Sequence, residues 1–337
     1  MKWKSHNIFL RPKLSHFPSG SAYRSALLSG IDAWNDTPSK VNYQVLQYDA
    51  SVKLGNGESE VYWSVLDPDA LAVTYCFGNL DCTYSETDIA YNVLLPFSTS
   101  TAKSQLKPYM PNGKNSFRTT TLHELGHAQG LDHEGDEYNV MGLSQNHVNT
   151  NGWFARTYVG EDTILASMNV YGKNSGTYHD LGVVHWRFWK TVYVEDQLPY
   201  SAHDRTRVFQ DGKVADVFIE WKDGAPKNSE PVFKVDSGAT IQVEFTFEHN
   251  GKGGSVSTFA KYYLSTNDYI TTGDDVLGQA TFNQSMANVY TRKQTLTLPS
   301  NLKSGKRYWI GVIVDPNNDL AETYESNNRT YVGICVN

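Results

Sequence analysis

The sequence has only three cysteines among its 337 residues and no long hydrophobic run. Its longest apolar run, Trp309 to Val314, is far shorter than the roughly 20 residues that a membrane-spanning helix needs. The first residues, Met-Lys-Trp-Lys-Ser-His, contain neither the apolar stretch nor the small-residue cleavage site of a signal peptide. We therefore expect no transmembrane segment, and a secreted, extracellular protein whose export signal is absent from this form. An intracellular enzyme is the alternative.

An excess of positive charge is also missing. The formal net charge is −7, so nothing in the composition suggests nucleic-acid binding. Aromatic residues are plentiful, with 21 Tyr and 8 Trp, whereas long helical patterns are sparse. This balance favours a β-rich protein, and the length of the chain is sufficient for two domains.

The few cysteines allow one short disulfide. Cys76 and Cys82 flank the turn-forming sequence Phe-Gly-Asn-Leu-Asp, which could close a hairpin. A bridge across so short a loop would stabilise the fold by about 2 kcal/mol. We expect this disulfide because secreted proteins commonly carry such bridges, with two free thiols as the alternative. Cys335 has no evident partner.

The most informative stretch begins at His123 and reads His-Glu-Leu-Gly-His-Ala-Gln-Gly-Leu-Asp-His. On a helix, His123 and His127 lie one turn apart and project from the same face. Glu124 can then lean over a metal without binding it, and Gly130 lets the backbone leave the helix sharply. The turn brings His133 back as a third ligand. Three neutral imidazoles with one open position are typical of a catalytic zinc site.

Met141 follows His133 by eight residues, in the sequence Tyr-Asn-Val-Met-Gly. The zinc motif and this methionine together resemble the metzincin metalloendopeptidases, most closely the matrixin branch. The resemblance implies an α+β catalytic domain with a mixed five-stranded sheet, three helices and a zinc cleft. It also implies that Zn²⁺ is held by His123, His127 and His133, with Glu124 as the general base and Met141 as a hydrophobic support.

The chain departs from the family after Met141. Gly142 and Leu143 stand where matrixins commonly have proline and some metzincins a tyrosine. In the resembling family the following loop forms the wall of a substrate pocket, which implies that Asn146, His147 and Trp153 line it here. Calcium is a common companion of such domains, so Ca²⁺ binding is a second expectation.

These residues predict a zinc-dependent endopeptidase. A zinc-bound water, activated by Glu124, would attack a peptide carbonyl of a protein substrate, and Glu124 would pass the proton to the leaving amine. An exposed edge strand at Leu71–Cys76 would bind the peptide as a further antiparallel strand. The alternative is a non-catalytic adhesin or binding protein on a metalloprotease scaffold.

Hydrophobic periodicity predicts three helices and five strands in the first half of the chain. The helices are expected from Ser21 to about Asn35, at Ser116–Gln129 and at Glu161–Tyr171. The strands are expected at Asn7–Arg11, Asn42–Tyr48, Glu60–Val65, Leu71–Cys76 and Asp88–Leu94. We assign residues 1–222 to the catalytic domain, with 173–222 as an extension of uncertain character.

A polar, turn-forming linker is expected at residues 223–230. Beyond it, alternating strands separated by glycine-rich turns predict an all-β immunoglobulin-like sandwich over residues 231–337. The stretch from Val314 to Asn328, together with Tyr262–Ser265, resembles bacterial CARDB domains. We expect a surface, glycan or protein ligand for this domain, and we expect short-peptide cleavage to survive its removal.

Overall fold

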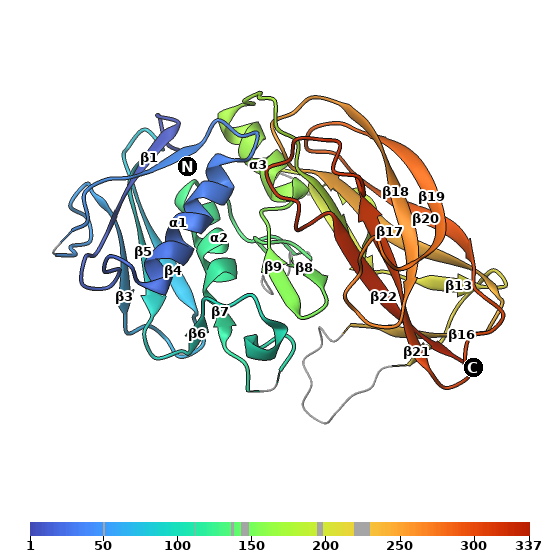
Figure 1. Ribbon diagram of the computed structural model, residues 1–337. Coiled ribbons are helices and arrows are strands. Elements are labelled where there is room, and N and C mark those ends of the chain that lie inside the picture. Colours follow the sequence, from blue (N-terminus) through green and yellow to red (C-terminus); the bar gives the residue numbers. More distant parts are fainter. Residues whose placement is uncertain (50, 111, 136–137, 143–147, 194–197, 219–229) are drawn as a thin grey trace.

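The first part of the chain folds into a mixed five-stranded sheet (Figure 1). The computed structural model describes residues 1–337 except 50, 111, 136–137, 143–147, 194–197 and 219–229. The strands are β1 (Asn7–Pro12), β2 (Asn42–Val45), β3 (Ser59–Ser64), β4 (Ala72–Gly78) and β5 (Tyr84–Asn92), in the order β2-β1-β3-β5-β4. Only β4 runs antiparallel to its neighbour, β5. It ends the sheet, which confirms the expected edge strand.

Two helices pack together beside this sheet, α1 (Ala22–Asn35) and α2 (Phe117–Ala128). Serine caps begin both, because the hydroxyls of Ser21 and Ser116 accept a backbone N–H three residues on. Gly30 allows the helices to approach closely, since a Cβ there would lie 2.7 Å from Thr121 Cγ2. The third helix, α3 (Glu161–Tyr171), lies within the expected bounds. Among the described residues, no helix is long and apolar enough to cross a membrane.

Short elements connect α2 to its surroundings. They are β6 (Phe97–Ser98), the 3₁₀ helix η1 (Lys103–Gln105), β7 (Asn115–Ser116), and the hairpin of β8 (Val148–Asn151) and β9 (Phe154–Thr157). The hairpin lies at the centre of the molecule, between the helices and the strands of the C-terminal half (Figure 1).

The C-terminal half is a β-sandwich of two sheets. One contains β10 (Leu181–Val184), β17 (Thr240–His249), β13 (Val208–Gln210), β14 (Lys213–Val214) and β20 (Val289–Thr297). The other contains β15 (Val217–Phe218), β16 (Val232–Val235), β22 (Arg329–Val336), β21 (Arg307–Val314), β18 (Val256–Ser265) and β19 (Asp275–Gln284). A further hairpin is formed by β11 (Trp186–Val192) and β12 (Tyr200–Arg205). Inward-facing residues such as Val183, Phe245 and Ile310 form the core between the sheets.

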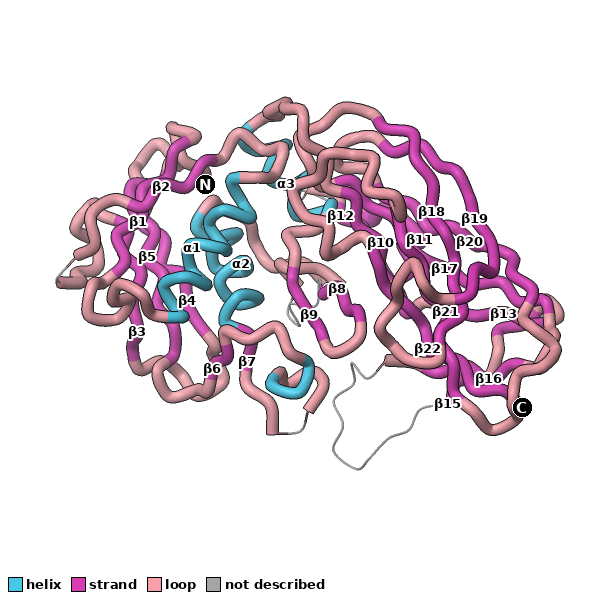
Figure 2. The backbone as a smooth tube through the Cα atoms, viewed as in Figure 1, coloured by secondary structure: helices cyan, strands magenta, loops and turns pink. Residues whose placement is uncertain are grey.

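The predicted fold class, α+β followed by a separate sandwich, is wrong for the chain as a whole. Strands hold 45% of the residues and helices 13%, and the molecule is mostly β, with several small sheets. Figure 2 shows the few helices between two groups of strands. The expectation failed because residues 173–222, rich in Val, Phe and Trp, form six further strands rather than an extension of a catalytic domain.

Strands from this segment complete the sandwich. Val183 in β10 pairs with Phe247 in β17, and Val208 in β13 pairs with Val243 of the same strand. β15 pairs with β16 across the predicted linker, whose residues 223–229 lie outside the described part of the chain. The strands before the linker therefore depend on those after it.

The two halves are also joined by polar contacts. Lys252 Nζ donates to the Asn35 carbonyl at 2.6 Å, and the hydroxyls of Tyr158 and Ser326 lie 2.6 Å apart. The fold of the first half therefore depends on the sandwich, and the survival of short-peptide cleavage after its removal stays a prediction.

We predict that deleting residues 224–337 lowers the melting temperature by at least about 10 °C, or prevents cooperative unfolding, because β10 and β13 lose β17. Thermal unfolding followed by circular dichroism measures this. A truncated chain with a melting temperature near that of the intact protein would contradict the interdependence of the two halves.

Candidate metal centre

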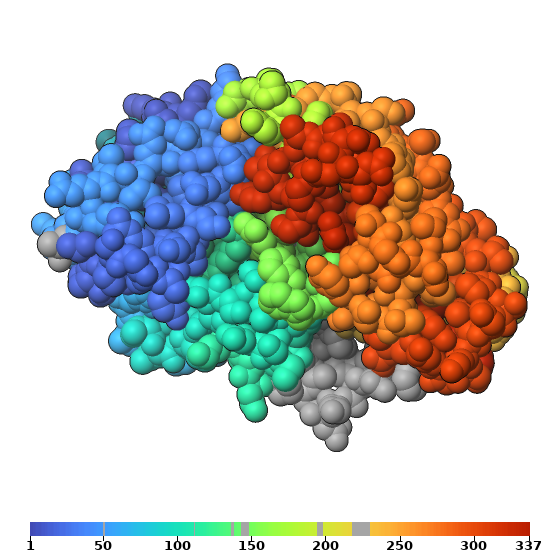
Figure 3. All heavy atoms as spheres, viewed as in Figure 1, coloured from blue at the N-terminus to red at the C-terminus, as the bar shows by residue number. Residues whose placement is uncertain are grey.

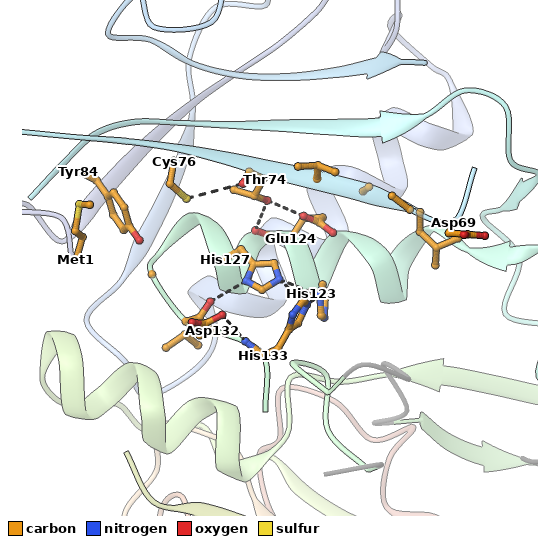
Figure 4. A pocket seen from close by; sticks show the side chains of 16 residues that line it. Met1, Asp69, Thr74, Cys76, Tyr84, His123, Glu124, His127, Asp132 and His133 are labelled. Atoms are coloured by element: carbon orange, nitrogen blue, oxygen red, sulfur yellow. Dashed lines mark hydrogen bonds between the residues drawn. The ribbon is translucent and has the colours of Figure 1, made fainter. Parts of the chain in front are cut away.

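Three histidine side chains converge at the C-terminal end of α2 (Figure 4). His123 and His127 project from one face of the helix. The chain then turns at Gly130, whose φ of +94° is the left-handed conformation expected there, and returns with His133. The Nε2 atoms lie 3.0 Å apart for His123 and His127, 3.0 Å for His123 and His133, and 3.1 Å for His127 and His133.

The hydrogen bonds of two rings show which nitrogens face inward. His123 Nδ1 lies 2.7 Å from the Val140 carbonyl, and His127 Nδ1 lies 2.8 Å from the Leu131 carbonyl. A carbonyl only accepts, so in the neutral rings the proton belongs on each Nδ1, and both Nε2 atoms present lone pairs. Two lone pairs 3.0 Å apart repel unless a cation lies between them. The cluster therefore fits a metal ion, whose usual zinc–nitrogen distance is about 2.0–2.1 Å.

The protonation of the rings agrees with this arrangement. Burial, followed by the neighbouring His127, lowers the pKa of His123 to about 3. Burial also lowers the pKa of His127. Both imidazoles are consequently neutral near pH 7, which is the form that binds metals. An all-imidazole donor set suits zinc, copper, iron and nickel.

Glu124 lies beside the cluster and is only 3% exposed. The hydroxyl of Thr74, on the edge strand β4, donates to Glu124 Oε2 at 2.7 Å and contacts the Glu124 carbonyl at 3.2 Å. Burial raises the pKa of Glu124 to about 7, and the hydrogen bond from Thr74 partly offsets the rise. This value is suited to a group that exchanges protons near neutral pH.

Sequence reasoning missed Thr74. Its only signal was the alternation along β4, which places Ala72, Thr74 and Cys76 on one face of the strand. That face is directed toward α2, as Figure 4 shows. Which helical residue it meets depends on packing between segments 50 residues apart.

A cavity of about 690 Å³ opens over the histidines and Glu124, between α2 and β4. Cys76 and Tyr84 line one end of it and Asp69 the other (Figure 4). Because β4 ends its sheet, the cavity runs along a strand that has no partner on that side in the described part of the chain.

Met141 packs against α2, the helix that carries His123 and His127. It is 3% exposed, and a Cβ on Gly126 would lie 2.2 Å from its sulfur. The turn before it is fixed by Asn139, which sequence reasoning also missed. Asn139 Oδ1 accepts from Met141 N at 2.8 Å, and its amide donates to Asp162 Oδ2 at 2.7 Å, at the start of α3.

The structure describes one of the three predicted pocket residues, Trp153. Asn146 and His147 lie outside the described residues. Trp153 lies in the turn between β8 and β9 and lines a different cavity, so its assignment to a pocket beside the three histidines is wrong. The reason is that residues 148–157 form a hairpin whose turn contacts the sandwich, where Gly152 N donates to the Asp268 carbonyl at 2.7 Å.

The predicted disulfide is also wrong, because Cys76, Cys82 and Cys335 are free thiols. Cys76 belongs to β4 and lines the cavity, whereas Cys82 occupies the following turn with a φ of 61°. Turn propensity between two cysteines does not determine where their side chains point.

A second cluster consists of three carboxylates, Glu60, Glu86 and Asp88, with oxygens within 4.8 Å of one another and exposed fractions of 0%, 1% and 0%. Glu86 accepts from the backbone N–H groups of Gly55 and Gly57, at 2.5 Å each. Glu60 Oε2 and Asp88 Oδ2 are buried without a hydrogen-bond partner. Burial and the neighbouring carboxyls raise the pKa of Asp88 well above its usual range.

Residues 215–332 match the CARDB family model, so the C-terminal part of the chain contains a CARDB domain. Among solved structures, the chain is similar to the crystal structure of the CARDB domain of the PF1109 protein from Pyrococcus furiosus in complex with di-metal ions. The sequence identity is 20% and the TM-score is 0.25. The match covers 31% of this chain and 79% of that chain. A solution structure of the same domain is 15% identical, with a TM-score of 0.28, covering 48% and 97%. No curated protein matches the chain. Residues 123–141 lie outside the CARDB match.

We predict that Gly126→Ala lowers the free energy of unfolding by about 1–3 kcal/mol, although alanine favours a helix by about 1 kcal/mol, because its Cβ would overlap Met141. In a Met141→Ala background the same change should become neutral or stabilising. Urea unfolding of the four proteins measures this cycle. An equal loss in both backgrounds would contradict the contact.

Proposed function

We propose that this protein is a zinc-dependent endopeptidase that hydrolyses peptide bonds of protein substrates. The observation that carries the proposal is the convergence of three Nε2 atoms beside the buried carboxylate of Glu124, in a cavity along the edge strand β4. The resemblance of residues 123–133 and Met141 to metzincin metalloendopeptidases supports the chemistry. The proposal rests on these residues and not on the fold class.

His123, His127 and His133 would hold the zinc ion. Zinc in such a site acts as a Lewis acid, which polarises a carbonyl oxygen and lowers the pKa of water. The carbonyls of Val140 and Leu131 keep the protons of two rings on Nδ1 and fix the ring orientations. This holds the ligands in place without rearrangement.

Glu124 would act as the general base and then as the general acid. Its Oε2 is occupied by the hydroxyl of Thr74, so Oε1 is the oxygen left to receive a proton from the attacking water. The same oxygen would return the proton to the leaving amine.

The substrate would bind in an extended conformation along β4. The unpaired edge of this strand offers backbone donors and acceptors, which an antiparallel peptide can pair with whatever its side chains are. Selectivity would then come from the cavity lining, which includes Leu71, Tyr84 and Asp69.

A non-catalytic adhesin or binding protein is the second candidate, and the CARDB match over residues 215–332 favours it. Such a protein would need no general base. The buried position of Glu124 therefore favours the peptidase, because burying a carboxylate lowers stability and a binding protein would gain nothing in return for that cost.

We also propose that Glu60, Glu86 and Asp88 bind calcium. The donor set consists only of oxygens, which Ca²⁺ prefers, and two of these oxygens are buried without a partner. No ion pair among the described residues compensates the three carboxylates, so a divalent cation would remove a large electrostatic penalty.

We predict that Glu124→Gln retains zinc but lowers kcat/KM for a peptide substrate by at least about a hundredfold, because the amide cannot accept the proton. Zinc content is measured beside peptidase activity. Glu58→Gln, which changes an exposed carboxylate paired with Arg11, serves as the control. Normal hydrolysis by the Glu124→Gln protein would exclude the proposed base.

We predict that Ca²⁺ at about a hundred times its Kd stabilises the protein by about 2.7 kcal/mol, and that Asp88→Asn abolishes this gain. Calorimetric unfolding with and without calcium measures it, and Asp81→Asn, at an exposed residue, is the control. If the cluster instead holds a shared proton, calcium will not change the melting temperature and Asp88→Asn will not lower it.

A further inference from the structure

A second cavity, of about 360 Å³, lies where the β8–β9 hairpin meets the C-terminal sandwich. In Figure 3 the light-green, orange and red segments of the chain meet in this region of the surface. Its lining includes Trp153, Phe154, Tyr269, Glu325 and Arg329, none of which lines the cavity over the histidines. The function proposed above makes no use of it.

Two large aromatic side chains line this cavity and remain open to solvent. Trp153 is 66% exposed and Tyr269 is 50% exposed. They come from different halves of the protein, since Trp153 follows β8 and Tyr269 follows β18. The Trp153 ring packs edge-on against Phe154, with centroids 5.7 Å apart and an interplanar angle of 85°. This contact orients the indole and leaves most of it uncovered.

One backbone hydrogen bond and two from the Asn151 side chain hold the segments of the two aromatic residues together. Gly152 N donates to the Asp268 carbonyl at 2.7 Å. The Asn151 side-chain amide donates from Nδ2 to the Ile270 carbonyl at 3.1 Å. Its Oδ1 accepts from the Ile270 N–H at 2.7 Å. A Cβ on Gly152 would lie 2.8 Å from Tyr269 Cδ2, so the tyrosine ring packs on the glycine backbone. A ligand would therefore meet a site that is already ordered.

The polar groups of the cavity have complementary roles. Glu325 provides a carboxylate, whose Oε2 accepts from the Asn328 amide at 3.1 Å and which has further acceptor capacity, and Arg329 provides a guanidinium that donates hydrogen bonds. Arg329 forms no ion pair among the residues that the structure describes. The opposite charges of these two side chains balance, so the site favours a neutral ligand that both donates and accepts.

We propose that this cavity binds a neutral saccharide. The C–H faces of a sugar ring can stack on Trp153 and Tyr269, while its hydroxyls both accept from Arg329 and donate to Glu325. The site is less suited to an extended peptide, because nearby backbone N–H and carbonyl groups already form hydrogen bonds within the protein. Lys103 N donates to the Trp153 carbonyl at 2.8 Å, and Ala155 N donates to the Thr101 carbonyl at 2.7 Å. The site would attach the protein to glycans independently of any catalytic activity.

Calorimetric titration of the full-length protein with tetra- to hexasaccharides of glucose, N-acetylglucosamine and mannose tests the proposal. We expect at least one series to bind, and Trp153→Ala and Tyr269→Ala each to weaken it by at least about tenfold. Trp189→Ala is the matched control. Trp189 is 50% exposed, as Tyr269 is, but it lies on β11, outside the cavity.

The thermal unfolding of each variant is compared with that of the wild type, so that a loss of binding is not confused with a loss of folding. The proposal is overturned if no series binds at concentrations up to about 10 mM. It is also overturned if Trp153→Ala and Trp189→Ala bind equally well, since the saccharide would then bind elsewhere, or if extended peptides displace it from this cavity.

Discussion

Repulsion between the imidazole lone pairs of His123 and His127 is the constraint on which the proposed function depends. The Nε2 atoms of His123, His127 and His133 lie 3.0–3.1 Å apart, and backbone carbonyls hold the protons of two of the rings on the opposite nitrogens. The two lone pairs of His123 and His127 repel each other unless a cation lies between them, which favours metal binding. The packing of Met141 beneath α2 and the left-handed turn at Gly130 both maintain this geometry.

The sequence predicted the local part of this arrangement well. The spacing of His123 and His127 and the conformation of Gly130 follow from helix geometry and from the missing side chain, which act over a few residues. Helix α3 has the expected bounds, and α1 and α2 begin at the expected caps. Thr74 and Asn139 could not be predicted, because their roles depend on contacts between segments that are distant in sequence.

The errors have a common physical origin. The disulfide, the pocket role of Trp153 and the fold class were inferred from local propensity or from resemblance, whereas strand pairing decided each outcome. Cys76 is fixed by its pairing in β4, Trp153 by the hairpin, and the strands at 181–218 by their partners in the sandwich. β-propensity indicates that a segment forms a strand but not which strand it joins.

Metal analysis of the purified protein, paired with cleavage of a general protein substrate with and without a chelator, tests the central claim most directly. The account predicts one zinc ion per chain at the histidine cluster, and cleavage that the chelator abolishes and added zinc restores. A protein that carries no zinc after preparation in zinc-containing buffer would contradict the account. Cleavage that is unaffected by removal of the metal would contradict it equally.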